Sequence, residues 1–220
     1  TGGNNTAVGF QALDSNTGGS TNVAVGTGAG TANTDGFDNT YVGPTAGMAV
    51  TTGDNNIMLG HDAGRTGSPG GSITTANNVI VLGDENIANA HIQVDWTVAS
   101  DQRDKTDFTD LDVGLDFVND LKPVTYKWDK RSKYADKDDD DYDISTLTHD
   151  GTHKEDWLDV GFKAQEVEAL ELAAGYKLSD KTNLTTKLTD DGKQYGLQYT
   201  KFVPILVKAI QELSAEIEIL

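Results

Sequence analysis

Several residue types are absent or scarce in this chain of 220 residues. It contains no cysteine, so neither a disulfide nor a thiolate metal site holds the fold, which must rest on packing alone. Lysine and arginine total 17 against 35 aspartates and glutamates, which gives a formal net charge of −18. Nucleic acids and anionic membrane surfaces are bound through clustered basic residues, so we expect neither as a partner.

Long hydrophobic runs are also lacking. The longest is Val203 to Val207, which Pro204 interrupts, so no segment is expected to insert into a membrane or to act as a secretion signal. Apolar residues make up 36% of the chain, a small supply for two independent cores, and we expect extra burial between copies. The sequence opens at Thr1 inside a repeat, from which we expect the C-terminal part of a longer protein.

The first half of the chain is periodic. Four glycines recur every 17 residues, each with an asparagine four positions earlier, an apolar residue directly before it and an alanine three positions later. The four copies lie at 5–12, 22–29, 39–46 and 56–63, around Gly9, Gly26, Gly43 and Gly60. A fifth, degenerate copy at 78–83 follows a six-residue insertion.

Each copy predicts a short strand, a glycine turn and a corner of small residues. Units this short cannot bury a face alone and must stack on their neighbours, as in a solenoid. Asparagine suits the turns because its side chain bonds local backbone groups and tolerates left-handed dihedrals. A flexible low-complexity linker is the alternative, but a linker has no reason to keep four positions in register.

These units resemble the N-x-A-V-G-type repeats of trimeric fibre and adhesin heads in bacterial autotransporters and phage tail fibres. The resemblance covers about residues 1 to 84. It implies three chains packed about a common axis. The fold class expected is therefore mixed β and α, with a homotrimeric β-solenoid or β-roll-like fibre segment followed by an α+β domain that ends in a coiled-coil helix.

Four motifs follow in the second half: S-D-x-R-x-K-T-D from Ser100, L-K-P-V-T-Y-K-W at 121–128, G-F-x-A-Q-E-V at 161–167, and Y-T-K-F-V-P-I-L-V-K-A-I-Q-E-L at 199–213. In this order they resemble the self-cleaving intramolecular chaperone domain at the C-terminus of phage tailspikes and tail fibres. The resemblance implies a repeat fibre segment at 1–99 and an auto-processing chaperone domain at 100–220. Asp104 and Lys163 depart from it, because the family more often has apolar residues there.

A serine five residues before a lysine is the candidate catalytic pair. The Ser100 hydroxyl needs a base to remove its proton, and Lys105 is that base in a Ser/Lys dyad. Lys105 must be neutral to act, which requires burial or a nearby cation, whereas its acidic neighbours favour the charged form. Arg103 is the only compensating charge nearby. We therefore hypothesise that packing of three chains desolvates Lys105, so that cleavage follows assembly.

The bond that breaks is implied by the resemblance to be Ser100–Asp101. Attack by the Ser100 hydroxyl on its own carbonyl needs a strained four-membered ring. Attack on the Ala99 carbonyl is sterically easier and cuts one residue earlier, and attack by a neighbouring chain's Ser100 is a third route.

The other motifs are interpreted as structural. Residues 199 to 220 predict an amphipathic helix with a near-heptad seam and Pro204 in its first turn, for which a coiled-coil trimer is the natural partner state. Residues 161 to 172 predict a second short helix, with Gln165 and Glu166 on its outside. Alternation at 124–128 and at 176–200 predicts hairpins, the second around Asp191-Gly192.

Two acidic or histidine-bearing segments invite a metal interpretation. The run from Asp136 to Asp143 lacks the glycine and glutamate that an EF-hand loop needs at its sixth and twelfth positions, so a solvated loop is favoured. His149 and His153 stand four apart, but Gly151 lies between them. We expect no bound metal and no cofactor.

Together these features predict the distal part of a phage tail fibre or tailspike, in the virion tail and assembled in the host cytoplasm. Its C-terminal domain is expected to drive homotrimerisation and folding, and then to release itself as a single-turnover serine endopeptidase. The mature fibre is expected to bind a host-cell surface receptor or glycan.

The alternative is a non-cleaving trimerisation cap of a bacterial surface adhesin-like fibre, which would share the repeats but should continue into a membrane anchor. A glycan-degrading tailspike needs paired carboxylates in a long β-domain, whereas residues 1–99 hold eight scattered acidic residues. A membrane-anchored transcription factor also carries this chaperone domain, but an acidic, repetitive upstream segment does not suit DNA binding.

Overall fold

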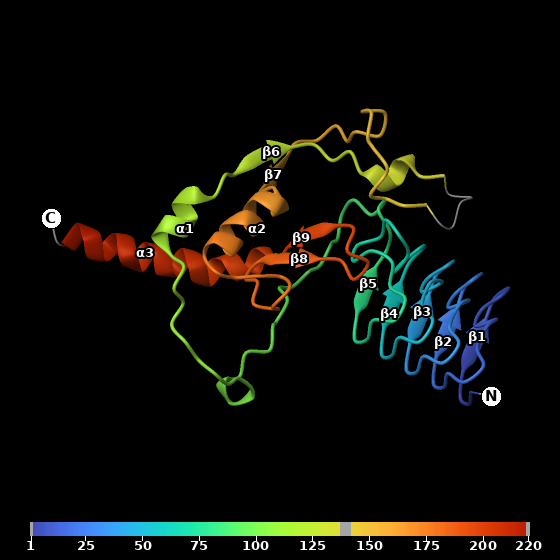
Figure 1. Cartoon of the computed structure of the whole chain (residues 1–220). Helices are drawn as coiled ribbons and strands as arrows, with labels where there is room; N and C mark the ends of the chain where they lie inside the picture. The colour runs from blue at the N-terminus through green and yellow to red at the C-terminus, as the bar shows by residue number, and fades with distance from the viewer. Residues whose placement is uncertain (1, 137–141, 219–220) are drawn as a thin grey trace. The chain divides into compact units, whose positions relative to one another are not determined.

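The computed structural model describes residues 2–136 and 142–218. They form two compact units, one made of residues 2–88, 127–136, 142–157 and 188–194 and the other of residues 89–126, 158–187 and 195–218. The strands of the first half (Figure 1) are β1 (Thr6–Val8), β2 (Val23–Val25), β3 (Thr40–Val42), β4 (Ile57–Leu59) and β5 (Ile80–Leu82). The later elements are α1 (Leu115–Asp120), β6 (Val124–Tyr126), β7 (Asp159–Gly161), α2 (Ala164–Ala173), β8 (Thr186–Leu188), β9 (Tyr195–Leu197) and α3 (Phe202–Glu218), with short 3-10 turns η1 (Gln102–Asp104), η2 (Arg131–Tyr134) and η3 (Tyr199–Lys201).

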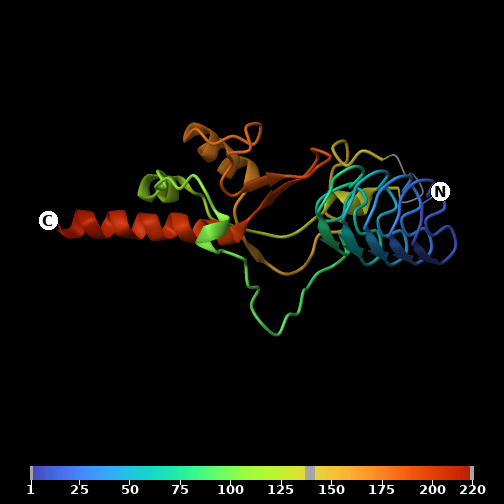
Figure 2. The ribbon, with the colours of Figure 1, turned by 90° about the horizontal axis from the view of Figure 1, so that it is seen from below.

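The repeats stack as a β-solenoid, as predicted. Strands β1 to β5 pair in parallel and in chain order, and their coils lie side by side in Figure 2. The register from β1 to β4 advances by the 17-residue repeat, so that Ala24 pairs with Tyr41 and Tyr41 with Met58. The degenerate fifth copy adds one more strand, with Ile57 opposite Ile80.

The repeated glycines are required where neighbouring coils approach each other. Gly26 has φ of +138°, which L side chains rarely adopt. A Cβ added there would lie 2.4 Å from the carbonyl oxygen of Gly43. The 17-residue glycine spacing is therefore the spacing of coils in backbone contact.

The left-handed turn residue and the repeated asparagine of each coil occupy separate positions. The left-handed residue is the one before the repeated asparagine: Thr21, Asp38 and Asn55 all have φ between 54° and 60°. The repeated asparagines themselves use their side chains between coils, and Asn22, Asn39 and Asn56 are fully buried there. The left-handed dihedral expected at the repeated asparagines therefore lies one residue earlier.

These buried side chains form a continuous ladder. The Asn39 Oδ1 accepts the backbone N–H of Asn56 at 2.9 Å, and its Nδ2 donates to the Gly53 carbonyl at 2.8 Å and to Asn22 Oδ1 at 3.0 Å. Each rung thus satisfies polar groups of the coil on either side.

Replacing Asn39 by alanine should therefore lower the free energy of unfolding by about 1–3 kcal/mol, because the Gly53 carbonyl and the Asn56 N–H of the following coil lose their partner. Asn5 forms the terminal rung and is only partly buried, so Asn5→Ala is the matched control with a smaller loss. Thermal unfolding of both variants measures the difference. Equal losses at the two positions would contradict a ladder whose inner rungs serve two neighbours.

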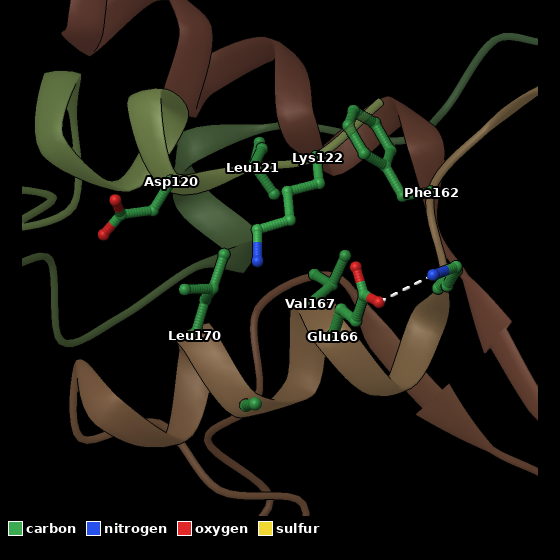
Figure 3. Close-up of a pocket in the computed structure, with 9 residues that line it drawn as sticks. Asp120, Leu121, Lys122, Phe162, Glu166, Val167 and Leu170 are labelled. Carbon is green, nitrogen blue, oxygen red and sulfur yellow. Dashed lines mark hydrogen bonds and ion pairs between the residues drawn. The ribbon is translucent and has the colours of Figure 1, made fainter. Parts of the chain in front are cut away.

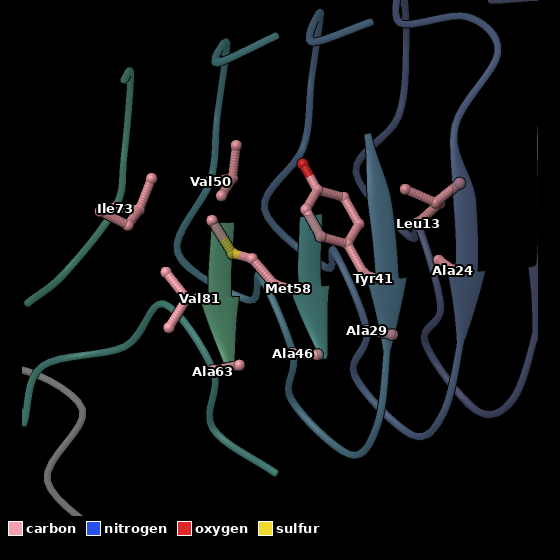
Figure 4. Packing of buried hydrophobic residues seen from close by; sticks show 10 residues of the cluster. All are labelled: Leu13, Ala24, Ala29, Tyr41, Ala46, Val50, Met58, Ala63, Ile73 and Val81. Carbon is pink, nitrogen blue, oxygen red and sulfur yellow. The ribbon is translucent and has the colours of Figure 1, made fainter. Parts of the chain in front are cut away.

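The solenoid interior is narrow and apolar. The central residue of each inner strand points inward, as do the corner alanines, which confirms the predicted small-residue corner (Figure 4). Tyr41 is the largest buried side chain, and Asn33 donates to its hydroxyl at 3.1 Å. The cluster consists of Leu13, Ala24, Ala29, Tyr41, Ala46, Val50, Met58, Ala63, Ile73 and Val81.

Two excursions from the second half of the sequence belong to the solenoid unit. The Tyr142 hydroxyl donates to the Thr66 carbonyl at 2.6 Å, and the Asp191 carboxylate accepts the Ser72 N–H at 2.9 Å. Contact with the repeats is thus made by residues far along the chain. The sequence predicts that residues 1–99 and 100–220 are separate domains. Whether each folds independently is not tested by these contacts, so the boundary stays a prediction.

In the second unit, α1 packs against α3 around Val113, Phe117 and Ile205. The Glu212 carboxylate on α3 accepts the Leu115 N–H at the start of α1, at 2.7 Å. This backbone hydrogen bond is the main reason why the pKa of Glu212 is lowered.

Two sequence predictions for this unit were wrong: the start of a helix and a local hairpin. The helix predicted over 161–172 begins only at Ala164, because Gly161 pairs with Val124 as the end of β7. The strand at 124–128 likewise forms no local hairpin, because β6 pairs with the distant β7. The hairpin at 176–200 is confirmed: β8 and β9 form a two-stranded sheet, and Thr189 N–H donates to the Gln194 carbonyl across the turn.

Helix α3 confirms the predicted amphipathic helix with Pro204 in its first turn, although residues 199–201 form the 3-10 turn η3. The seam predicted at 202, 205, 206, 209, 210, 213, 217 and 220 divides into two faces. Phe202, Ile205 and Ala209 are buried within the unit, while Leu206, Ile210, Leu213 and Ile217 join Val203 and Val207, which were not predicted as seam positions, in a second row that is 44–63% exposed. Leu220, the last seam position predicted, lies outside the described residues. None of the described helices has the length and apolarity to cross a membrane.

Candidate active site

The structure brings the two candidate catalytic residues together. Lys105 Nζ donates a hydrogen bond to Ser100 Oγ at 2.6 Å. The 3-10 turn η1 lies between them, and the Asp101 side chain caps it by accepting the Arg103 N–H at 2.9 Å. This turn reverses the chain over five residues and returns the lysine to the serine.

The charge of Arg103, the compensating cation expected near Lys105, is paired with Asp101. Its guanidinium forms a bidentate ion pair with Asp101, with Nη2 2.6 Å from the carboxylate. The side-chain hydrogen bond from Arg103 lowers the pKa of Asp101 and raises that of Arg103 itself. Sequence reasoning missed this pairing, which orders the turn around the predicted scissile bond.

The whole segment from residue 91 to residue 110 is exposed. A general base must accept the serine proton, and Lys105 Nζ lies within hydrogen-bond distance of the serine oxygen. The single chain does not bury Lys105. The geometry of a Ser/Lys dyad is thus present without the buried environment that the chemistry requires.

The other motifs pack against one another. Phe162 stacks on Phe202 with ring centroids 5.3 Å apart and on Tyr199 at 6.3 Å. A Cβ on Gly161 would lie 2.3 Å from the Tyr199 hydroxyl, which explains the glycine of that motif. Their interpretation as structural elements agrees with this packing.

Two of these motifs also line a pocket of about 190 Å³ between the end of α1 and α2 (Figure 3). Leu121, Val167 and Leu170 form its apolar wall, and the Lys122 side chain reaches into it. Glu166, predicted to lie on the outside of its helix, is at the rim and pairs with Lys163 at 2.8 Å. Gln165 is exposed.

Glu171 is a buried carboxylate that sequence reasoning did not single out. It is 1% exposed and accepts five hydrogen bonds, from the backbone of Leu184 and from both the backbone and hydroxyl groups of Thr185 and Thr186, at 2.6–3.1 Å. Burial by itself would raise the pKa of Glu171, but the hydrogen bonds outweigh it and lower the pKa. Glu171 joins α2 to the start of β8. No local sequence pattern predicts a contact between Glu171 and residues 184–186.

Among the described residues, one group has metal-ligand geometry: His61, Asp62 and Asp84. His61 Nδ1 lies 3.0 Å from Asp84 Oδ2, while Arg65 bonds Asp62 at 2.9 Å and Asn86 bonds Asp84 at 3.0 Å. Hydrogen bonds within the chain thus satisfy the group as a structural network.

The segments considered for metal binding from the sequence contribute no ligand set to the described part of the chain. His153 instead packs edge-on against Tyr134, at 4.7 Å between ring centroids. Residues 137–141 of the acidic run lie outside the described residues.

Comparison with known proteins bears on the Ser100 segment directly. No curated protein and no solved structure matches the chain. Residues 100–176 match the protein-family model described as chaperone of endosialidase. The match begins at Ser100 and contains Lys105, α1, β6, β7 and α2. The segment that carries the Ser/Lys pair is therefore similar to the endosialidase chaperone domains, a family of the self-cleaving peptidase type.

Proposed function

We propose that this chain is the distal part of a phage tail fibre or tailspike whose C-terminal domain drives homotrimerisation and folding and then cuts itself off at Ser100–Asp101. The observation that carries the proposal is the 2.6 Å approach of Lys105 Nζ to Ser100 Oγ, at the start of the family match. The fibre would act in the virion tail, be assembled in the host cytoplasm and bind a host-cell receptor or glycan.

The reaction proceeds in two steps. Neutral Lys105 takes the proton of the Ser100 hydroxyl while its oxygen attacks the carbonyl of the scissile bond. The C–N bond breaks, the new amine of Asp101 takes the proton back from Lys105, and water hydrolyses the remaining ester. Attack by Ser100 of one copy on the Ser100 carbonyl of another copy avoids the four-membered ring.

Two unpartnered apolar surfaces support the oligomer. On the solenoid, the outward residues of the strands form a row that is 37–67% exposed: Val8, Val23, Val25, Val42, Ile57, Leu59, Ile80 and Leu82. On α3, the second row of apolar residues, from Val203 to Ile217, is also exposed. Rows of this length are the surfaces that identical chains bury when they pair.

Introducing a charge on the α3 row tests whether assembly controls cleavage. Ile210→Asp should weaken association by about 10- to 100-fold, because the apolar contact of one isoleucine side chain with the other copies is lost. Cleavage should fall with it, although Ser100 and Lys105 are unchanged. Light scattering gives the oligomeric state and intact mass gives the cleaved fraction. Gln211→Asp places the same charge on the neighbouring exposed residue and should preserve both.

A monomeric Ile210→Asp chain that cleaves at the parental rate would contradict control by assembly. A parent that is trimeric and stays whole would instead support the second candidate, a non-cleaving trimerisation cap of a bacterial adhesin-like fibre. The exposure of Lys105 in the single chain is the observation that favours this candidate.

A further inference from the structure

The segment between the repeats and Ser100 has an apolar pattern that no described part of the chain covers. Apolar and polar residues alternate from residue 92 to residue 98. This period of two places the apolar residues on one face if the segment is a strand. The four apolar side chains are 51–76% exposed: Ile92, Val94, Trp96 and Val98.

The backbone of this segment is equally unpartnered. Residues 89–99 have no regular secondary structure, with bends at Gln93 and Val94, and make no backbone hydrogen bond to another described residue. The segment is therefore free to adopt an extended conformation against a partner. A second copy packed on the apolar row would remove these side chains from water.

We propose that residues 92–98 form an extended strand that packs, apolar face to apolar face, in parallel and in register against the same segment of a second copy. Ile92, Val94, Trp96 and Val98 then pack between the copies. This inference rests on the proposed homo-oligomer and names the part of the chain that joins its copies upstream of the scissile bond.

Charge favours an identical copy as the partner. Copies of a chain with a net charge of −18 repel each other, but residues 89–99 contain a single carboxylate, Asp95. The twenty residues from 101 to 120 contain seven. In parallel register Asp95 lies on the face opposite the apolar row, where water screens it. The weakly charged stretch is therefore where copies can approach.

The position of the strand has a consequence for cleavage. Val98 lies two residues before Ser100, so pairing at residues 92–98 holds the scissile segments of two copies side by side. A Ser100 hydroxyl of one copy then lies near the Ser100–Asp101 bond of the next, as attack between copies requires. The same approach removes water from Lys105.

Cysteine cross-linking tests the strand, since the natural chain contains no cysteine. Val94→Cys and Val98→Cys on the apolar face are compared with Asp95→Cys and Thr97→Cys on the opposite face, all in a Ser100→Ala background. After mild oxidation, non-reducing gels should show disulfide-linked dimers at least about tenfold faster for the apolar-face pair, because only those sulfurs come within bonding distance. The two positions on each face guard against a single variant that fails to assemble.

Light scattering on the same samples separates the possible failures. Trimers in which both faces cross-link equally, or only the polar face does, overturn the intermolecular strand and leave the proposed function standing. Monomers overturn both. Trimers with cross-linking confined to residues 94 and 98 support the strand.

Discussion

Ser100→Ala and Lys105→Arg are expected to leave the chain whole under conditions in which the parent separates into two pieces at Ser100–Asp101. Each change should slow cleavage on the order of 10³-fold or more, because the nucleophile and its base act as one unit. Arginine keeps the positive charge and the reach of Lys105, but its guanidinium does not lose a proton and so is no base. A time course of intact mass on freshly refolded chain measures the rate.

Gln102→Ala is the control for this pair, since Gln102 is exposed in the same turn and takes no part in the reaction. It should cleave like the parent. Fragment masses distinguish Ser100–Asp101 from Ala99–Ser100, because the boundary moves by one residue. Cleavage of Ser100→Ala at the parental rate would overturn the dyad, and light scattering must show that each variant assembles.

The second large effect is expected at Glu171. Glu171→Ala should lower the free energy of unfolding by at least about 3 kcal/mol, because three backbone donors lose their acceptor at a cost of about 1–3 kcal/mol each. The five donors around the carboxylate then have no acceptor at the junction of α2 and β8. Urea unfolding in a Ser100→Ala background keeps the chain whole during the measurement.

Glu166→Ala is the matched control on the same helix. Glu166 pairs with Lys163 at the surface, where exposed ion pairs add little stability. Its unfolding midpoint should stay close to that of the parent. Similar losses at both positions would show that the buried carboxylate is not what joins α2 to β8.

The same carboxylate makes stability depend on pH. The pKa of Glu171 in the folded chain is lowered below its ordinary value of 4.5. Its contribution is therefore fully present above pH 4.5 and is lost as the pH falls through the lower, folded value. The parent should lose more stability than Glu171→Gln over this acid range, which paired denaturation curves measure.

Periodic features of the chain were predictable from the sequence because they repeat. The 17-residue glycine spacing led to the stacked strands, and the spacing of apolar residues led to helix α3 with Pro204 in its first turn. Ser100 and Lys105 were identified through a motif, and the distance between them depends on a local turn that Asp101 caps. Repeats and local caps depend on residues that are close together in the chain, so they can be predicted from the sequence.

Contacts between distant segments were not predictable in this way. The pairing of β6 with β7, which displaced both a predicted hairpin and the start of a predicted helix, joins strands separated by a long excursion. The five donors around Glu171 converge only after the chain at 184–186 folds back onto α2. Arg103, assigned from its position to assist Lys105, pairs with Asp101 instead because side-chain rotamers decide among several carboxylates.

The sequence by itself determined the repeat, its register, the terminal helix and the residue types of the candidate dyad. Only the tertiary structure decided which apolar rows are buried within one chain and which stay exposed, since burial depends on what packs against a face. In the same way, only the structure showed that Lys105 lies beside Ser100 and is open to solvent. The environment in which a lysine becomes a base is a property of packed neighbours, and residue spacing along one chain does not contain it.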